Sequence, residues 1–212
     1  RYYEWYFGIP MRIETPGRES ITGVVLAGGM ARRMGGQDKG LVPFAGHPLV
    51  QWVIDALSPQ VSTLVINANR NGATYAAYGY PVIADDIDGF QGPLAGFASA
   101  MVAAETSWIV TLPCDGPFPA PDLVERLCAA LAEQDAEIAV ASDGNRMQPV
   151  YALIPVSLAP SLQAFLASGE RKIDRWYAEH RIALADFSDR PQGFANINSA
   201  EDSQLLERQL GK

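Results

Sequence analysis

The sequence has few of the residues on which several classes of protein depend. It contains only 2 cysteines and 2 histidines among 212 residues. Cys114 and Cys128 form neither a metal-ligand spacing nor a disulfide framework, so we interpret them as small buried residues in a reducing cytoplasm. His47 and His180 suggest no Ser-His-Asp arrangement, and we interpret both as ordinary surface residues.

Long apolar runs and an excess of basic residues are also missing. No apolar run approaches the roughly 20 residues of a membrane-spanning helix, and no stretch has the basic-apolar-small order of a signal peptide, so we expect a cytoplasmic location. The formal net charge is −8, from 24 acidic and 16 basic residues. This charge argues against binding nucleic acid through bulk electrostatics. A phosphorylated ligand would need a local basic cluster, and the stretch with Arg32, Arg33 and Lys39 is one.

Short apolar strands alternate with amphipathic helices from Ile21 onward. The expected strands are 23–26, 63–66, 81–84, 108–112, 138–141, 150–154 and 183–187, and the expected helices are 49–57, 73–78, 93–105, 121–133, 156–167, 171–179 and one from Ser199. Asp143-Gly144-Asn145 is typical of a hairpin turn. The alternation predicts the α/β class, as a single Rossmann-like three-layer domain with a mostly parallel central sheet. We expect that domain to span residues 21–212, and the aromatic-rich residues 1–20 to be an extension outside the core fold.

Polar residues follow several of the expected strands. They are the loop at Gly28, then Asn67, Asp85-Asp86, Asp115 and the pair Asn196 and Asn198. In an open α/β sheet, ligands bind beyond the carboxyl ends of the strands. We therefore expect these residues to lie along one edge of the sheet.

The first of these loops indicates a polyphosphate site. Gly28 and Gly29 let the main chain approach a ligand closely, and successive N–H groups in such a turn bind anions. Arg33 and Lys39 add positive charge, and arginine can chelate phosphate oxygens. The loop is not a Walker loop or a dinucleotide fingerprint, because the spacing of its residues differs from both. A flexible surface turn is the alternative interpretation.

Two acidic residues and a glycine-rich helix start are further candidates. Asp115 follows an apolar strand and could bind Mg²⁺, which prefers one or two carboxylates together with phosphate oxygens; otherwise it is a helix cap. Asp85 is comparable, with the two interpretations evenly balanced. The segment 92–96 opens a helix with small residues, so it is either a ligand-binding helix start or a tight packing joint.

Several segments in this order resemble one known family. Leu26-Ala27-Gly28-Gly29, Arg33-Met34-Gly35 and Lys39 look like the signature loop of the sugar-nucleotide-type nucleotidyltransferases, whose fold is the nucleotide-diphospho-sugar transferase type. Within that superfamily the chain is most similar to the molybdenum cofactor guanylyltransferases. The likeness extends through Val65-Ile66-Asn67-Ala68-Asn69-Arg70, Gly92-Pro93-Leu94-Ala95-Gly96, Pro113-Cys114-Asp115 and Asn196-Ile197-Asn198. Met147-Gln148-Pro149 departs from it, because some relatives have a histidine before this proline.

The resemblance implies a reaction and a set of site residues. GMP would pass from GTP to the terminal phosphate of molybdopterin carrying molybdenum, with Mg²⁺ as cofactor and pyrophosphate as the second product. The implied GTP-binding residues are Leu26, Ala27, Gly28, Gly29, Lys39, Asn67, Asp85 and Asp115, and the implied molybdopterin-binding residues are Arg33, Gly36, Gly92, Gly96, Asn196 and Asn198. Lys39, Asp115 and Arg33 would be catalytic, with Asp115 as the metal ligand. Protein partners would be other cofactor-biosynthesis proteins and molybdoenzyme chaperones.

Three other functions fit parts of the same pattern. A cytidylyltransferase for the same pterin or a sugar-1-phosphate nucleotidyltransferase would use a similar loop. A non-catalytic nucleotide-binding subunit that delivers the cofactor is the third, and the presence of both Lys39 and Asp115 argues against it.

Overall fold

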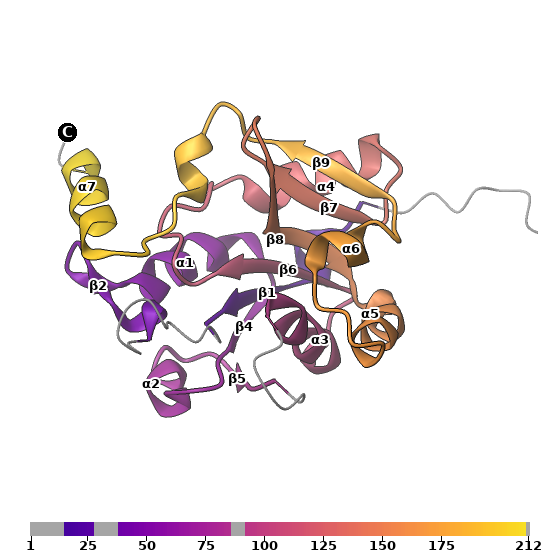
Figure 1. Cartoon of the computed structure of the whole chain (residues 1–212), viewed down its shortest axis with the longest axis horizontal. Helices are drawn as coiled ribbons and strands as arrows, with labels where there is room; N and C mark the ends of the chain where they lie inside the picture. The colour runs from indigo at the N-terminus through magenta and orange to yellow at the C-terminus, as the bar shows by residue number, and fades with distance from the viewer. Residues whose placement is uncertain (1–14, 28–37, 86–91, 211–212) are drawn as a thin grey trace, which may run out of the picture.

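The computed structural model describes residues 15–27, 38–85 and 92–210, and the central element of this part of the chain is a seven-stranded sheet (Figure 1). Its strands, in spatial order, are β5 (Val82–Ile83), β4 (Thr63–Asn67), β1 (Ile21–Leu26), β6 (Trp108–Pro113), β8 (Met147–Pro155), β7 (Ile138–Ser142) and β9 (Ile182–Asp186). All neighbouring strands are parallel except β8, which is antiparallel to both β6 and β7. The expected mostly parallel α/β sheet is confirmed.

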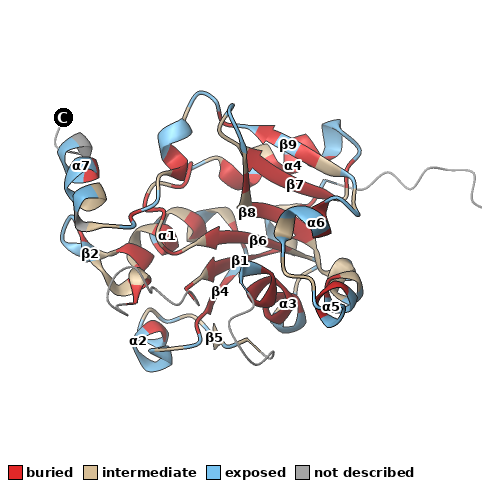
Figure 2. Ribbon diagram, viewed as in Figure 1, coloured by how far each residue is buried: buried red, intermediate tan, exposed pale blue. Residues whose placement is uncertain are grey.

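Helices cover both faces of this sheet. They are α1 (Leu49–Leu57), α2 (Gly72–Ala76), α3 (Pro93–Ala103), α4 (Leu123–Glu133), α5 (Ala159–Ala167) and α6 (Ile173–Tyr177). A further helix, α7 (Ala200–Leu210), lies outside these two layers. Successive strand residues point to opposite faces, so Val25 packs in the core with α1 and α4, whereas Val24 packs in a second core with α3, α5 and α6. Figure 2 shows the central strands β1, β4, β6 and β7 mostly buried, whereas the edge strands β5 and β9 are partly exposed. The three-layer arrangement follows from this alternation.

The expected hairpin is present, and its second strand, β8, is longer than the sequence pattern indicated. Asp143 accepts main-chain hydrogen bonds from Asn145 and Arg146, which closes the turn before Met147. β8 therefore begins at Met147, three residues before the expected strand. A register shift between Val140 and Ala141 absorbs the irregular start of the pairing.

Two of the later helices are shorter than expected. Residues 156–158 form a 3-10 turn, and α5 begins only at Ala159 with a proline in its first turn. The helix expected over 171–179 is limited to Ile173–Tyr177. Beyond Tyr177 the chain forms turns in place of a helix. In one of them the N–H of His180 donates to the carbonyl of Tyr177.

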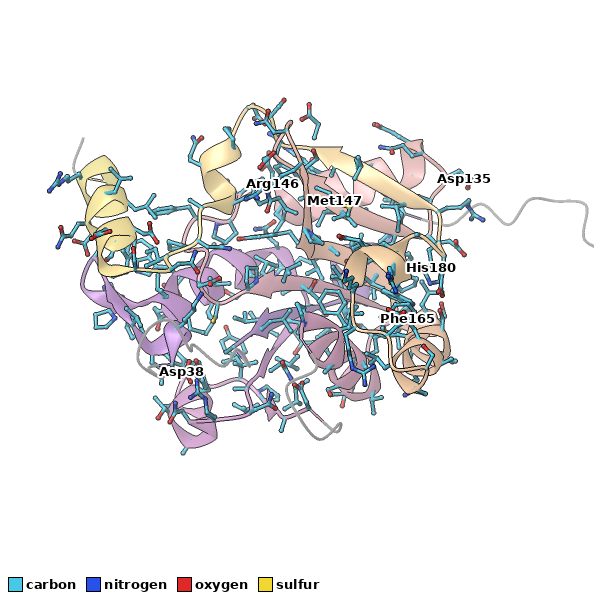
Figure 3. All side chains as sticks on the ribbon, viewed as in Figure 1. Asp38, Asp135, Arg146, Met147, Phe165 and His180 are labelled. Atoms are coloured by element: carbon cyan, nitrogen blue, oxygen red, sulfur yellow. The ribbon has the colours of Figure 1, made fainter. Side chains whose placement is uncertain are left out.

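Both cysteines are buried, as expected, but one histidine is not at the surface. The side chain of His180, labelled in Figure 3, is only 9% exposed and lies edge-on to the ring of Trp176 at 5.0 Å. The interpretation of His180 as a surface residue is therefore wrong. Its position after α6 folds the imidazole back toward Ser161, whose hydroxyl lies 3.2 Å from Nε2.

Residues 15–20, which belong to the expected extension, contact the domain. Pro16 is buried, and its carbonyl accepts a hydrogen bond from the thiol of Cys128. Arg18 donates to the carbonyl of Val61. Residues 1–14 lie outside the described part of the chain. Across 15–27, 38–85 and 92–210, no helix has the length and apolarity that a membrane crossing requires.

A small separate core attaches the C-terminal helix. The hairpin of β2 (Pro43–Phe44) and β3 (His47–Pro48) contributes Phe44, which packs with Leu49, Ile197 and Leu206 of α7. Ser199 caps α7 by accepting from the N–H of Asp202, as its sequence context indicated. This core places the segment before α7 beside the carboxyl ends of the central strands (Figure 1).

Candidate active site

The carboxyl ends of β1, β4 and β6 lie level with one another. Leu26 pairs with Asn67 of β4 on one side and with Pro113 of β6 on the other. The main chain continues this order past the strands, because Ala27 N–H donates to the carbonyl of Asn67 and Cys114 N–H donates to the carbonyl of Leu26. The sheet therefore brings the loops after these three strands to one edge, as the sequence predicted.

The first cluster at this edge joins a cation, a carboxylate and an amide. Lys39 Nζ lies 3.0 Å from Asp115 Oδ2 and 2.6 Å from Asn198 Oδ1. The side chains of Lys39 and Asp115 are 26% and 13% exposed, so the ion pair is partly screened from water but still accessible. Residues far apart in the sequence thus meet at one point beyond β1 and β6.

Main-chain contacts hold this first cluster in place. The carbonyl of Asp115 accepts from Ile197 N–H, which ties the loop after β6 to the segment before α7. The N–H of Asn198 donates to Asp202 Oδ2, and this bond, the largest cause, holds the pKa of Asp202 below its ordinary value. Asn196 belongs to the same segment, and its Oδ1 would lie 3.2 Å from a Cβ placed on Gly116.

The second cluster lies beyond β4 and β5. Asp85 accepts from the side-chain amides of Asn67 at 2.9 Å and Asn69 at 2.7 Å, one on each carboxylate oxygen. Asn69 also accepts from the N–H of Asp85, so the two residues are fixed in both directions. Each carboxylate oxygen can accept more than one hydrogen bond, so this carboxylate can still receive donors from a ligand.

Two glycines shape the edge between these clusters. Gly92 precedes α3 with φ of +76°, a conformation that residues other than glycine rarely adopt. A Cβ on Gly96 would lie 2.6 Å from Asn67 Oδ1 and 2.7 Å from Leu26 Cδ2. Gly96 therefore allows α3 to approach β1 and β4 closely, which is a packing role that its sequence context left open.

Gly28, Gly29, Arg33 and Gly36 lie outside the described residues. Asp86, the neighbour of Asp85, lies outside them as well.

A magnesium ion at Asp115 would need most of its oxygen ligands from the bound nucleotide. Among residues 15–27, 38–85 and 92–210, no group of three or more His, Cys, Asp or Glu side chains is arranged to hold a metal ion. Mg²⁺ commonly binds through one or two carboxylates, substrate phosphate oxygens and water. A single carboxylate beside a lysine fits that mode of binding, because the triphosphate would supply the other oxygens.

The sequence reasoning missed a third group of residues beside Lys39. Asp38 is 8% exposed and accepts from Tyr75 Oη at 2.6 Å and from Asn71 Nδ2 at 2.9 Å. The sequence signal that could have revealed this group is the position of Asp38, directly before Lys39. Figure 3 labels Asp38 close to helix α2.

An α/β sheet with a basic and an acidic side chain at the carboxyl ends of its central strands is the arrangement expected of a nucleotidyltransferase. Residues 23–183 match the family model of the MobA-like NTP transferase domain. The molybdenum cofactor guanylyltransferase of Shewanella sediminis (strain HAW-EB3) is 50% identical over 192 residues, which cover 91% of this chain and 98% of that protein. The chain belongs to the molybdenum cofactor guanylyltransferase family.

Solved structures agree with this fold. Molybdopterin-guanine dinucleotide biosynthesis protein A from Archaeoglobus fulgidus superimposes with a TM-score of 0.74 at 24% identity, covering 90% of this chain and 98% of that one. A 4-diphosphocytidyl-2C-methyl-D-erythritol synthase from Anaerococcus prevotii superimposes with a TM-score of 0.72 at 10% identity, covering 92% and 97%. At these identities the likeness supports the sheet and its helices alone.

Proposed function

We propose that this chain transfers GMP from GTP to the terminal phosphate of molybdenum-bearing molybdopterin. Membership of the guanylyltransferase family supports the donor and the acceptor. The single observation that carries the assignment of the site is the Lys39–Asp115 pair at the carboxyl ends of β1 and β6, where open α/β sheets bind ligands. The reaction would take place in the cytoplasm, and cofactor-biosynthesis proteins and molybdoenzyme chaperones would be the protein partners.

The cluster around Asp85 would bind the base of the nucleotide, and the cluster around Lys39 would bind its phosphates. Asp85, held by Asn67 and Asn69, offers acceptor oxygens at one end of the edge. Guanine carries two donors on its Watson–Crick edge, at N1 and N2, which suit a carboxylate. Lys39 lies at the other end and would contact the phosphates. The N–H of Ala27 is already bonded to Asn67, so Ala27 would contact the nucleotide through its carbonyl group.

The transfer itself needs alignment and charge neutralisation more than proton transfer. An oxygen of the acceptor phosphate attacks the α-phosphorus, the bond from that phosphorus to the oxygen bridging to the β-phosphate breaks, and pyrophosphate leaves with the electron pair. The attacking oxygen is already anionic, so no general base is required. Lys39 would stabilise negative charge on the phosphates. A magnesium ion held by Asp115 would supply Lewis-acid chemistry at the same oxygens.

The remaining site residues would orient the acceptor. Asn198 accepts from Lys39, and Asn196 lies on the same segment, so both lie where an acceptor would meet the phosphates. The family likeness assigns the same role to four further residues, Arg33, Gly36, Gly92 and Gly96. Leu26, Gly28 and Gly29 would contact the nucleotide through the main chain.

One experiment separates this function from its alternatives. The protein is incubated with molybdopterin, Mg²⁺ and each nucleoside triphosphate in turn, and pyrophosphate and the dinucleotide product are measured. Turnover with GTP alone supports the proposal, and turnover with CTP or dependence on a sugar phosphate contradicts it. Tight nucleotide binding without turnover would identify a binding subunit.

A further inference from the structure

Tyr75 is a buried tyrosine whose hydroxyl lies beside the candidate phosphate lysine. It belongs to helix α2 and is 0% exposed. Its hydroxyl donates to Asp38 Oδ1 at 2.6 Å, across 37 residues of sequence. Burial raises the pKa of this hydroxyl well above its ordinary value, so it remains a protonated donor.

The same hydroxyl fixes both sequence neighbours of Lys39. Asp38 precedes the lysine, and Gly40 follows it with its N–H 3.3 Å from Asp38 Oδ1. A Cβ on Gly40 would lie 2.5 Å from Tyr75 Oη and 3.3 Å from Cys114 Sγ, so the main chain at Gly40 fits directly against both side chains. Cys114 precedes Asp115, and the tyrosine therefore packs at the junction of the two loops that carry the ion pair.

The second oxygen of Asp38 is also engaged. Asn71 Nδ2 donates to it at 2.9 Å from the turn before α2, where Asn71 has φ of +53°. The carboxylate thus receives hydrogen bonds on both oxygens from the segment after β4, and a third from Gly40. A carboxylate held from three directions leaves the short 3-10 turn Lys39–Leu41 little freedom to rotate.

We propose that Tyr75 and Asp38 form a positioning pair that sets the location of Lys39 during nucleotide transfer. Neither side chain touches the substrate; they act through the main chain of residues 38–40. The inference rests on the proposed function, in which Lys39 contacts the phosphates. A misplacement of about 1 Å in a group that aligns a reaction can cost on the order of 10²-fold in rate.

The test is a double-mutant cycle between Tyr75→Phe and Lys39→Ala, with kcat/KM for GTP and the Kd for GTP as the measurements. Tyr75→Phe removes one oxygen atom and keeps the buried ring. We expect it to lower kcat/KM by at least about 10-fold in the parent, but by less than about 2-fold when Lys39 is already alanine, because contacting groups that act as a unit are not additive.

Two further variants separate positioning from loss of stability. Tyr177→Phe is the matched control, because Tyr177 is also buried and its hydroxyl donates to the carbonyl of Pro149 at 2.7 Å, far from Lys39. It should lower the melting temperature comparably and leave kcat/KM unchanged. If Tyr75→Phe fails to fold, Asn71→Gly removes the other donor to Asp38 and tolerates the positive φ, and it should show the same dependence on Lys39.

Each outcome has a distinct meaning. Parent-like kinetics for Tyr75→Phe, or an equal loss with and without Lys39, would overturn the positioning role while leaving the phosphate-binding role of Lys39 intact. Parent-like kinetics for Lys39→Ala would instead refute the proposed role of that lysine, and the positioning role with it. A loss confined to the parent background supports the pair.

Discussion

Replacing Asp115 by asparagine removes one negative charge from the site and changes little else. The side chain keeps its shape, and its amide oxygen can still accept from Lys39. The ion pair that is lost is partly exposed, with side chains 26% and 13% accessible. Such pairs contribute about 1 kcal/mol or less, which corresponds to a fall in melting temperature of at most about 4 °C for a domain of this size.

The expected effect on the rate is far larger than the effect on stability. Removing one preorganised electrostatic stabiliser costs on the order of 10²-fold in kcat, equivalent to about 2.7 kcal/mol of activation free energy. Pyrophosphate release with saturating GTP, molybdopterin and Mg²⁺ measures this rate. The variant should therefore be nearly as stable as the parent and about a hundredfold slower.

Asp122→Asn is the matched control for this substitution. Asp122 precedes α4 and forms ion pairs with Arg126 at 2.8 Å and Arg190 at 3.7 Å, without contact to the Lys39 cluster. It should lose stability with turnover retained. Near-parent turnover of Asp115→Asn in saturating Mg²⁺ would refute the metal role of Asp115, whatever the control shows.

Two other properties can be checked independently. Gly96→Ala should slow GTP turnover and lower the melting temperature, because its Cβ would approach Asn67 Oδ1 and Leu26 Cδ2 within 2.7 Å, whereas Gly72→Ala, with nothing within 4 Å, should do neither; equal effects would contradict this packing role. Burial raises the pKa of Cys128 from 9.0 to about 11. The thiol ionises at a lower pH in the unfolded chain than in the folded protein. Its contribution to the free energy of unfolding is therefore complete below pH 9 and is lost as the pH rises through 11, a loss of about 3 kcal/mol at most. Urea titrations of the parent between pH 8 and 11 should show the decline, and Cys128→Ala should reduce it; an unchanged slope in the variant would contradict the assignment.

The sequence allowed the sheet and its functional edge to be predicted because both depend on local patterns. Apolar strands such as 23–26 and 108–112 end in polar or glycine residues, and parallel strands bring such ends together. That Asp115 and Asn198 both contact Lys39 follows from the same reasoning only in part. The small core of Phe44, Ile197 and Leu206 holds the last segment there, and no periodicity in the sequence indicates that contact.

The same limit applies to Asp85 and to the ends of β8. Spacing left Asp85 evenly balanced between a functional residue and a structural one. Its hydrogen bonds come from Asn67, the last residue of β4, and from Asn69, just beyond that strand, and spacing does not reveal such contacts. The boundaries of β8 were misjudged for a related reason. The turn at Asp143 is closed by side-chain acceptance from Asn145 and Arg146, which extends pairing into residues whose sequence pattern is irregular.

The segment from Asn67 to Tyr75 shows why the two halves of the site cannot be considered separately. Asn67 and Asn69 hold Asp85 at the end proposed for the base, while Asn71 and Tyr75 hold Asp38 beside the lysine proposed for the phosphates. The segment leaves β4 and turns into α2, so its successive side chains reach opposite ends of the edge. A shift of its main chain would disturb both ends together. Substitutions of the side chains that hold the two carboxylates, those of Asn67, Asn69, Asn71 and Tyr75, should therefore change nucleotide affinity and turnover jointly, whereas Asp115→Asn acts on turnover through charge alone.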